Sequence, residues 1–350
     1  MNILRQVIRW TLLVLLFTIA AFLSILLYNV LQMEQVKVDE LPQIETQQQL
    51  KKEPIQFDDS VFSLIHKTRD EVLQLLGEPE RKDPSAYGYT WWIYSDEEAY
   101  LQVGILNEQV ETVFAIGNSL DSEPISVGDS FAEVVEKYPL QRKVTFEKGI
   151  SYYTFLLNDE DLKTHPLIKL DDNLFVQCYI DTFTQKVSGL RIMTGDLLLT
   201  QRFYEMEYRG TLPEEVVLSD KDWESIQAGM EKQIFDLTNI IRKRHNLEPV
   251  KYDEVVSEVA YLHSKDMYEN QYFSHESKDG KGLKERLEAK EVYYVGAGEN
   301  IAAQHVDAIA AVQGWLNSSG HRETLLSEEY NYLGVGVYRL YYTQNFILKY

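Results

Sequence analysis

A long stretch without charged residues lies near the start of the chain and constrains what the rest can become. The run from Trp10 to Leu31 has 22 residues, mostly Leu, Val, Ile, Phe and Ala, and none of them is charged. At a rise of 1.5 Å per residue, a helix of this length is about 30 Å long, which matches the hydrocarbon core of a bilayer. The sequence therefore predicts one N-terminal transmembrane helix, with residues 1–31 as a membrane anchor.

The charges that flank this run predict its orientation. Two arginines and no acid precede it, whereas three acids and one lysine follow it up to residue 40. By the positive-inside rule, the N-terminus stays in the cytoplasm and the chain after Leu31 is extracytoplasmic. A cleaved signal peptide is the alternative, but Gln32–Gln35 fits a small-x-small cleavage site poorly. We therefore expect a single-pass protein of the cell membrane, with the membrane as a partner of the N-terminal helix.

Composition and charge exclude several classes of protein. The 34 Lys+Arg and 55 Asp+Glu give a formal net charge of -21, which argues against a nucleic-acid partner because a polyanion binds a basic surface. The single cysteine, Cys178, can form neither an internal disulfide nor a CxxC metal site. Residues 32–58 are rich in Gln, Glu and Lys without apolar periodicity, and we interpret them as a flexible stalk.

The next part of the chain contains two segments that begin alike. Thr68 and Ser130 each precede a short helical pattern, and Glu71 and Glu133 follow three residues later, which is the spacing of a capping box. Strand-like runs follow each helix, at 87–94, 100–106 and 109–116 in the first unit and at 151–157, 174–181 and 186–193 in the second. The repeat of about 62 residues predicts a duplicated domain of helix plus antiparallel sheet at residues 59–205.

The first of these units is dense in aromatic residues. They are Tyr87, Tyr89, Trp91, Trp92, Tyr94 and Tyr100. We favour a sheet that packs on both faces. The alternative is an exposed platform for protein or glycan contacts, which would make this domain a scaffold.

The C-terminal part alternates helical and strand patterns after a predicted linker at 206–222. Helices are predicted at about 226–241, 253–269, 283–289 and 307–316, and strands at 332–340 and 345–349. Gly334 and Gly336 alternate with apolar residues, so one face of their strand carries no side chains there. Such a face lets a helix or a loop approach the backbone closely.

Three motifs of this C-terminal part occur together. They are YFSHESKDG at Tyr272–Gly280, GAGENIA at Gly296–Ala302 and WLNSSGHR at Trp315–Arg322. Their order and spacing resemble the CAP superfamily (cysteine-rich secretory proteins, antigen 5 and pathogenesis-related 1 proteins) in its cysteine-free bacterial form. Residues 59–205 resemble the CAP-associated N-terminal domain of Gram-positive bacteria. The resemblance implies an α-β-α sandwich at residues 223–350, and hence an α+β fold for the whole extracytoplasmic part.

The resemblance also implies a cleft, in which the family typically gathers two His and two Glu. His275, Glu299 and His321 match three of these by position, and the second Glu falls on Ser318. With Asn300 beside Glu299, these five residues form the expected ligand cleft.

The chemistry of these residue types leaves alternatives open. Two neutral imidazoles and a carboxylate can bind Zn²⁺ with water as a fourth ligand, and metal-bound water is acidic enough for hydrolysis with a general base. If Glu299 is a ligand, no second motif carboxylate remains as the base. Alternatively, His275 and His321 are the metal ligands and Glu299 is the catalytic base or supports a ligand.

A purely structural interpretation is equally open from the spacing alone. His275 and Glu299 would then bind nearby backbone groups, and Gly296 and Gly298 would shape a turn. Ser319 or Gly320 would start a short helix, with His321 as an ordinary polar residue in its first turn. His263, one position after Leu262, is interpreted as a packed or solvated helix residue.

These observations predict a binding module at the cell envelope. Its ligand is expected to be a peptide, a lipid or a cell-wall fragment, with Zn²⁺ or another divalent cation as the candidate cofactor. The alternatives are a metal-dependent hydrolase with Glu299 as its catalytic residue, and a scaffold that uses the aromatic middle domain.

Overall fold

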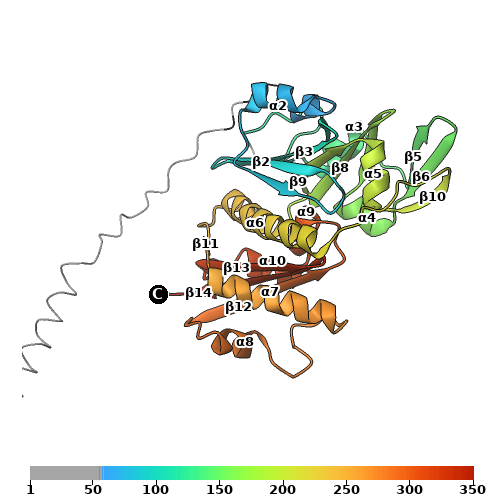
Figure 1. Ribbon diagram of the computed structural model, residues 1–350. Coiled ribbons are helices and arrows are strands. Elements are labelled where there is room, and N and C mark those ends of the chain that lie inside the picture. Colours follow the sequence, from blue (N-terminus) through green and yellow to red (C-terminus); the bar gives the residue numbers. More distant parts are fainter. Residues whose placement is uncertain (1–54, 56, 58, 118) are drawn as a thin grey trace, which may run out of the picture. The chain divides into compact units, whose positions relative to one another are not determined.

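The computed structural model describes residues 55, 57, 59–117 and 119–350 (Figure 1). The predicted anchor at 1–31 and almost all of the predicted stalk at 32–58 lie outside the described residues. Within the described part, no helix is both long enough and apolar enough to cross a bilayer. This part is a mixed α+β structure with sheets of seven, three and four strands.

Each unit of the duplicated domain begins with a short capped helix. At α2 (Arg69–Leu76), which follows the 3-10 helix η1 (Val61–Leu64), the Thr68 side chain accepts a hydrogen bond from the Glu71 N–H while the Glu71 carboxylate accepts one from the Thr68 N–H. Ser130 and Glu133 make the same reciprocal pair at α3 (Phe131–Lys137). Both predicted capping boxes are confirmed, and they satisfy N–H groups that the start of a helix leaves without intrahelical partners.

The two units share one antiparallel sheet of seven strands. Its strands are β1 (Arg81–Pro84), β2 (Thr90–Ser95), β3 (Ala99–Leu106), β4 (Gln109–Gly117), β7 (Leu167–Asp171), β8 (Leu174–Asp181) and β9 (Lys186–Met193). The order β1-β2-β3-β4-β9-β8-β7 pairs the last strands of the two units in the middle. A bridge joins each helix cap to the first residue of its unit's last strand, Thr68 to Gln109 and Ser130 to Lys186. This equivalence supports the predicted duplication.

The second unit departs from its predicted strands. Residues 151–157, predicted as the first strand of its sheet, instead form β6 (Ser151–Leu156) in a separate sheet of order β10-β6-β5, and β7 takes their place beside β8. The other elements of this region are β5 (Lys143–Lys148), α4 (Asp159–Thr164), α5 (Gly195–Gln201) and β10 (Glu205–Arg209). Because β10 pairs with β6, the segment predicted as a linker at 206–222 begins as a strand rather than as coil.

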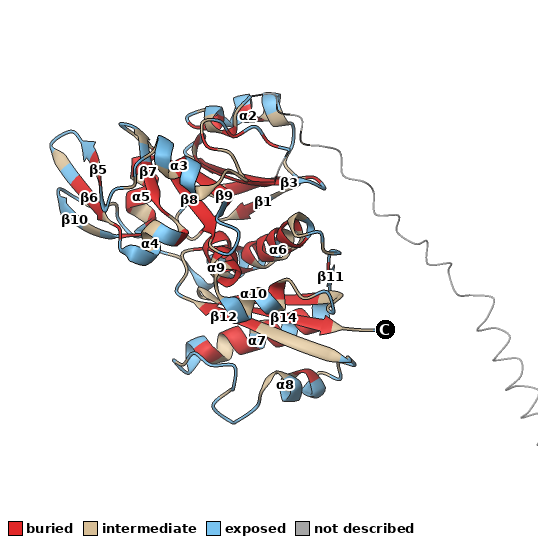
Figure 2. Ribbon diagram, turned by 180° about the vertical axis from the view of Figure 1, so that it is seen from behind, coloured by how far each residue is buried: buried red, intermediate tan, exposed pale blue. Residues whose placement is uncertain are grey.

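The C-terminal domain is a four-stranded sheet. The sheet lies between two helical layers (Figures 1 and 2). Its helices are α6 (Asp220–Arg244), α7 (Glu254–Glu269), α8 (Leu283–Ala289), α9 (Ala308–Asn317) and α10 (Ser319–Leu325). Its strands are β11 (Lys251–Tyr252), β12 (Gly296–Ala303), β13 (Tyr332–Tyr338) and β14 (Tyr341–Leu348), in the order β11-β13-β14-β12. Helices α6, α9 and α10 lie on one side of the sheet, and α7 and α8 lie on the other (Figure 1).

The two glycines of β13 determine how closely α7 packs. A Cβ at Gly334 would lie 2.3 Å from the backbone N of Ser257, and a Cβ at Gly336 would lie 1.9 Å from the backbone N of Tyr261. Atoms cannot pack at such distances, so any larger residue would push the helix away from the sheet. The predicted close approach to the bare face of this strand is confirmed.

One apolar core runs from the duplicated domain into the C-terminal domain. Trp91 and Phe114 of the large sheet belong to the same buried cluster as Ile234 of α6 and Trp315 of α9. Figure 2 shows the buried residues concentrated on the sheets and on the helices between them. The two domains therefore share a hydrophobic interior rather than touching only through polar surfaces.

The aromatic residues of the first unit belong to the interior. Tyr89, Trp91, Trp92, Tyr94 and Tyr100 are buried, and the half-buried Tyr87 donates a hydrogen bond to the Val306 carbonyl. Trp91 packs into the core shared with the C-terminal domain, whereas Trp92 packs into the core on the other face of the sheet. The sheet packed on both faces is confirmed, and the exposed aromatic platform is wrong for this cluster.

Candidate functional site

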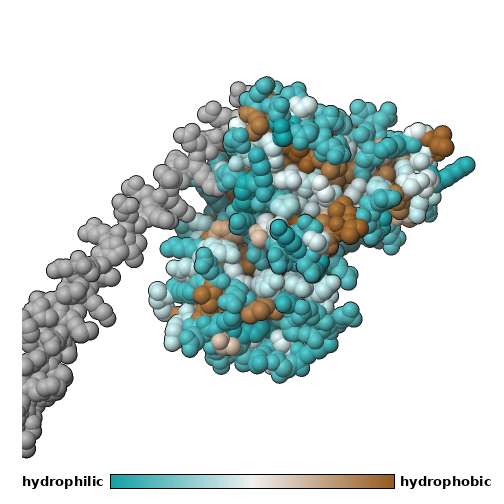
Figure 3. All heavy atoms as spheres, viewed as in Figure 1, coloured by the Kyte–Doolittle hydropathy of each residue, from teal (hydrophilic) through white to brown (hydrophobic). Residues whose placement is uncertain are grey.

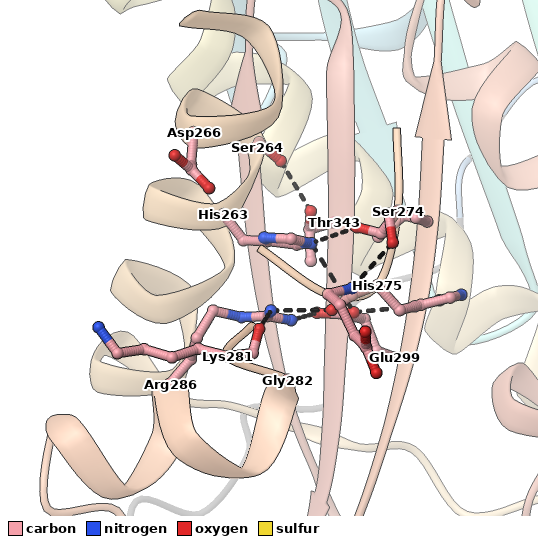
Figure 4. A network of polar contacts seen from close by, with 12 residues as sticks. His263, Ser264, Asp266, Ser274, His275, Lys281, Gly282, Arg286, Glu299 and Thr343 are labelled. Atoms are coloured by element: carbon pink, nitrogen blue, oxygen red, sulfur yellow. Dashed lines mark hydrogen bonds and ion pairs between the residues drawn. The ribbon is translucent and has the colours of Figure 1, made fainter. Parts of the chain in front are cut away.

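His275 and Glu299, which come from separate motifs, are in direct contact. The His275 Nδ1 lies 2.9 Å from the Glu299 Oε1 (Figure 4). Glu299 lies on β12 with a side chain that is 4% exposed, whereas His275 lies in the loop after α7 with a side chain that is 55% exposed. An imidazole that donates from Nδ1 keeps the lone pair of its Nε2 for a metal ion or a ligand proton.

Arg286 of α8 holds the second oxygen of the same carboxylate. Its Nη2 lies 2.6 Å from the Glu299 Oε2, and its Nη1 donates to the backbone carbonyls of His275 at 2.9 Å and Lys281 at 3.1 Å. One guanidinium thus fixes both the carboxylate and the loop that carries His275 (Figure 4). Arg286 is not predicted from the sequence, because nothing in its local pattern separates it from an ordinary residue of a short helix.

His263 of α7 is the third neighbour of the carboxylate. Its Nε2 lies 3.1 Å from the Ser274 carbonyl oxygen and 3.9 Å from the Glu299 Oε1, and its side chain is fully buried. Of the two predicted roles, the packed residue is confirmed and the solvated one is wrong. Helical spacing could have shown this, because Val256, Ala260, His263 and Met267 recur at steps of three and four and all are buried.

The surrounding charges favour the ionised form of Glu299. Burial by itself would raise the pKa of this carboxyl, but the hydrogen bond from His275 and the nearby charge of Arg286 outweigh it and lower the pKa below its usual value. Burial lowers the pKa of His263, so the neutral imidazole is favoured there. Glu299 is therefore a buried carboxylate whose two oxygens both have partners.

His321 reaches the same region from α10. Burial lowers the pKa of His321, and the neighbouring His275 lowers it further, because positive charges on both rings would repel each other. The Asn300 side-chain amide donates to the His321 carbonyl at 3.0 Å, which ties the first turn of α10 to β12. Asn300 is itself buried, so it acts on the cleft through the backbone of His321.

Ser318 stands at the junction of α9 and α10. Its side chain makes no capping hydrogen bond, while its carbonyl accepts the Arg322 N–H at 2.7 Å. At this position the structure therefore supplies a hydroxyl at the start of the helix that carries His321, and no carboxylate.

The glycines of the second motif lie in a strand. Gly296 and Gly298 both belong to β12, so the alternative in which they shape a turn is wrong. A Cβ at Gly298 would lie 2.7 Å from the Tyr330 hydroxyl and 2.9 Å from the Thr324 Cγ2, so glycine lets α10 approach the strand. The alternative in which the His275 side chain binds loop backbone is also wrong, because its Nδ1 faces Glu299.

The duplicated domain makes hydrogen bonds to the junction of α9 and α10, called the corner below. The Arg322 guanidinium makes two hydrogen bonds of 3.0 Å to the Asp181 carboxylate at the end of β8. The Asn317 side chain accepts from the Thr182 N–H at 2.8 Å and donates to the Ile180 carbonyl at 2.8 Å. The corner that carries Ser318 and His321 is therefore held by the turn after β8.

The residues fit one of the two predicted metal arrangements better than the other. In the described part of the chain, no group of three or more His, Cys, Asp or Glu side chains is arranged to hold a metal ion. Glu299 is poorly suited to be a third metal ligand, because its two carboxylate oxygens already have His275 and Arg286 as partners. In the other predicted arrangement, His275 and His321 would be the ligands and Glu299 would orient the His275 ring, as carboxylates commonly do for metal-binding histidines.

Comparison with known proteins decides the family. The model of the CAP-associated N-terminal domain matches residues 65–204, and that of the cysteine-rich secretory protein family matches residues 235–350. A Bacillus subtilis (strain 168) relative named "Uncharacterized membrane protein YlbC" is 47% identical over 290 residues, which are 83% of this chain and 84% of that protein. The chain belongs to the cysteine-rich secretory protein (CAP) family.

Two solved structures of similar proteins extend over both domains. An extracellular protein containing a SCP domain from Bacillus anthracis str. Ames is 40% identical, with a TM-score of 0.79, and covers 87% of this chain and 100% of its own. A cysteine-rich secretory protein from Staphylococcus aureus subsp. aureus Mu50 is 26% identical, with a TM-score of 0.74, and covers 85% of this chain and 95% of its own. The pairing of a CAP domain with the preceding domain is therefore shared with these proteins.

Proposed function

We propose that this CAP-family protein is an extracytoplasmic binding module, anchored in the cell membrane, whose cleft at His275, Glu299 and His321 takes a peptide, lipid or cell-wall ligand. The uncharged run at Trp10–Leu31 supports the anchor. The names of two relatives, one a membrane protein and the other an extracellular protein, agree with this location.

The pKa and the hydrogen-bond partners of Glu299 favour a binding site over a catalytic site. A general base needs an oxygen within reach of the substrate proton and a pKa near the working pH. The pKa of Glu299 is lowered, and both of its oxygens are paired with side chains of the protein. Such a carboxylate is suited to hold the exposed His275 ring in one orientation, as a preorganised binding site requires.

We further propose that His275 and His321 bind a divalent cation such as Zn²⁺. The lowered pKa of His321 supports this, because a metal ligand must be a neutral imidazole. The contact between His275 and Glu299 supports it as well, since the carboxylate would hold the ring in one orientation. A bound cation would supply a coordination position for a carboxylate or carbonyl group of the ligand.

Zinc titration by calorimetry tests the metal part of the proposal. Wild-type protein should bind about one Zn²⁺ per chain, and both His275→Ala and His321→Ala should lose it. Glu299→Gln should weaken the affinity for Zn²⁺ by about 10–100-fold without abolishing it, as is typical for a residue that orients a metal-binding side chain. No uptake by folded wild-type protein would refute the metal and leave a polar cleft.

Histidine NMR tests the binding module itself. Soluble muropeptides from digested cell wall, added to protein labelled at His Cε1, should shift the resonances of His275 and His321. The signal of His66, at the start of the duplicated domain, serves as the internal control. Cleavage of the added peptides, lost in Glu299→Gln, would favour the hydrolase instead.

A further inference from the structure

A second pocket lies between α7, α8 and the loop that joins them. It has a volume of about 410 Å³, within the range of small-molecule sites. Its apolar lining consists of Val259 and Leu262 of α7 and Ala289 of α8. The cleft residues His275, Glu299 and His321 are not among those that line it, although His263 and Arg286 lie at both places (Figure 4).

Two buried nitrogen atoms of this lining have no hydrogen-bond partner among the described residues. They are the Nε of Arg286 and the Nδ1 of His263, whose side chains are 10% and 0% exposed. The Arg286 Nε is a donor, whereas the His263 Nδ1 is an acceptor because the other ring nitrogen donates to the Ser274 carbonyl. A buried polar group without a hydrogen-bond partner is destabilising, so a ligand that offers one acceptor and one donor is favoured.

One cation of the pocket is left without an acidic partner among the described residues and can meet an anionic group. Four cations and two acids line the pocket, in a chain whose formal net charge is -21. Three of these cations already have acidic partners, since Lys281 pairs with Asp279, Lys290 with Glu258 and Arg286 with Glu299. The Lys278 Nζ donates to the Asn270 carbonyl and makes no ion pair with any residue that the structure describes.

The apolar part of the lining gives the pocket a second requirement. Leu262 is 44% exposed although it faces this pocket, so contact with a ligand would remove apolar surface from water. Over the C-terminal domain, the face seen in Figure 3 is mainly hydrophilic with small hydrophobic patches. An apolar group of a ligand would therefore bind at a small local site around Leu262 and not on an extended hydrophobic surface.

We propose that this pocket binds the C-terminal residue of a peptide with an apolar side chain. The side chain packs on Val259, Leu262 and Ala289. The terminal carboxylate binds between Lys278 and the Arg286 Nε, and the amide N–H of the same residue donates to the His263 Nδ1. A carboxylate, an N–H and an apolar group on adjacent atoms are what distinguish a peptide C-terminus from a fatty acid or an inorganic anion.

The proposed pocket and the cleft share Arg286, although the pocket does not depend on what the cleft binds. The guanidinium that would meet the peptide carboxylate through Nε also holds Glu299 through Nη2 and the His275 carbonyl through Nη1. Peptide binding should therefore stiffen the loop that carries His275, which couples the two sites through one side chain.

Calorimetry with three probes tests the ligand class, using the full chain in lipid nanodiscs. Acetyl-Ala-Ala-Leu should bind at one site per chain. Its C-terminal amide should bind about tenfold more weakly or worse, because the charge-assisted hydrogen bonds to the carboxylate are lost. Octanoate should also bind more weakly, since it lacks the N–H. Equal binding of the peptide and its amide would overturn the proposal, and tighter binding of octanoate would assign the pocket to acyl chains.

Two matched surface variants test the location. Leu262→Asp puts a charged group where the apolar side chain of the peptide packs and should reduce the affinity about tenfold or more. Leu75→Asp, at a position 38% exposed on α2, is the control and should bind like wild type. Both leucines are partly exposed, so neither substitution leaves a cavity in the hydrophobic core. Circular dichroism checks that both variants are folded. Equal affinities of the two variants would overturn the assignment to this pocket.

Discussion

A buried ion pair between the two domains yields a quantitative prediction about stability. The Arg191 Nη2 of β9 lies 2.7 Å from the Asp307 carboxylate before α9, and the two side chains are 0% and 4% exposed. The Nε and Nη1 of Arg191 have no partner among the described residues, so Asp307 is its main source of compensation. Asp307→Asn should therefore destabilise the protein strongly, by leaving a guanidinium charge buried between the domains.

The structure also allows the size of this effect to be worked out. Removing one partner of a buried ion pair typically costs about 3–5 kcal/mol. Asp307 accepts the Ala310 N–H at 3.0 Å as the cap of α9, a role that Asn can keep and Ala cannot. Asp307→Ala should therefore cost about 1 kcal/mol more than Asp307→Asn. The double variant Arg191→Met, Asp307→Asn should recover most of the loss, because no uncompensated charge remains.

Urea unfolding, followed by tryptophan fluorescence on residues 59–350, measures these differences. Because the two domains share one apolar core, we expect a single cooperative transition. Glu215→Gln is the control, since it breaks an exposed pair of similar length, 2.7 Å, with Arg202, and should hardly move the midpoint. A midpoint for Asp307→Asn equal to that of this control, or a double variant as unstable as the single one, would refute the prediction.

Three further predictions concern packing and pH. Gly336→Ala places a Cβ 1.9 Å from the backbone N of Tyr261 and should cost about 3 kcal/mol or more in urea unfolding, whereas Gly320→Ala, in open space on α10, should be neutral or add about 0.5–1 kcal/mol. Because the pKa of Glu299 is lowered in the folded protein, its ionised form stabilises the fold above the ordinary pKa of 4.5. This contribution is lost as the pH falls through the folded pKa. Below pH 4.5, the free energy of unfolding of Glu299→Gln should therefore fall less steeply with pH than that of the wild type. An NMR titration should place the midpoint of His321 below 6.5, and a midpoint above that value would contradict the burial of this ring.

What the sequence determined by itself was local. The capping boxes at Thr68 and Ser130 follow from residues three positions apart, and the bare face of β13 follows from Gly334 and Gly336 two positions apart. The motifs around His275, Glu299 and His321 also showed the family. In each case the interacting groups, or the pattern that marks them, lie within a few residues, so spacing alone carries the information.

The surroundings of the site were decided only by the tertiary structure. Arg286 occupies one oxygen of Glu299 because α8 packs beside β12, and Asp181 holds the corner near His321 because the duplicated domain docks on α9 and α10. These partners are 13 and 141 residues apart in the sequence, and no local pattern marks them. Their pairing depends on how the apolar faces of whole elements pack, and this packing determines which polar groups are buried together and must satisfy one another.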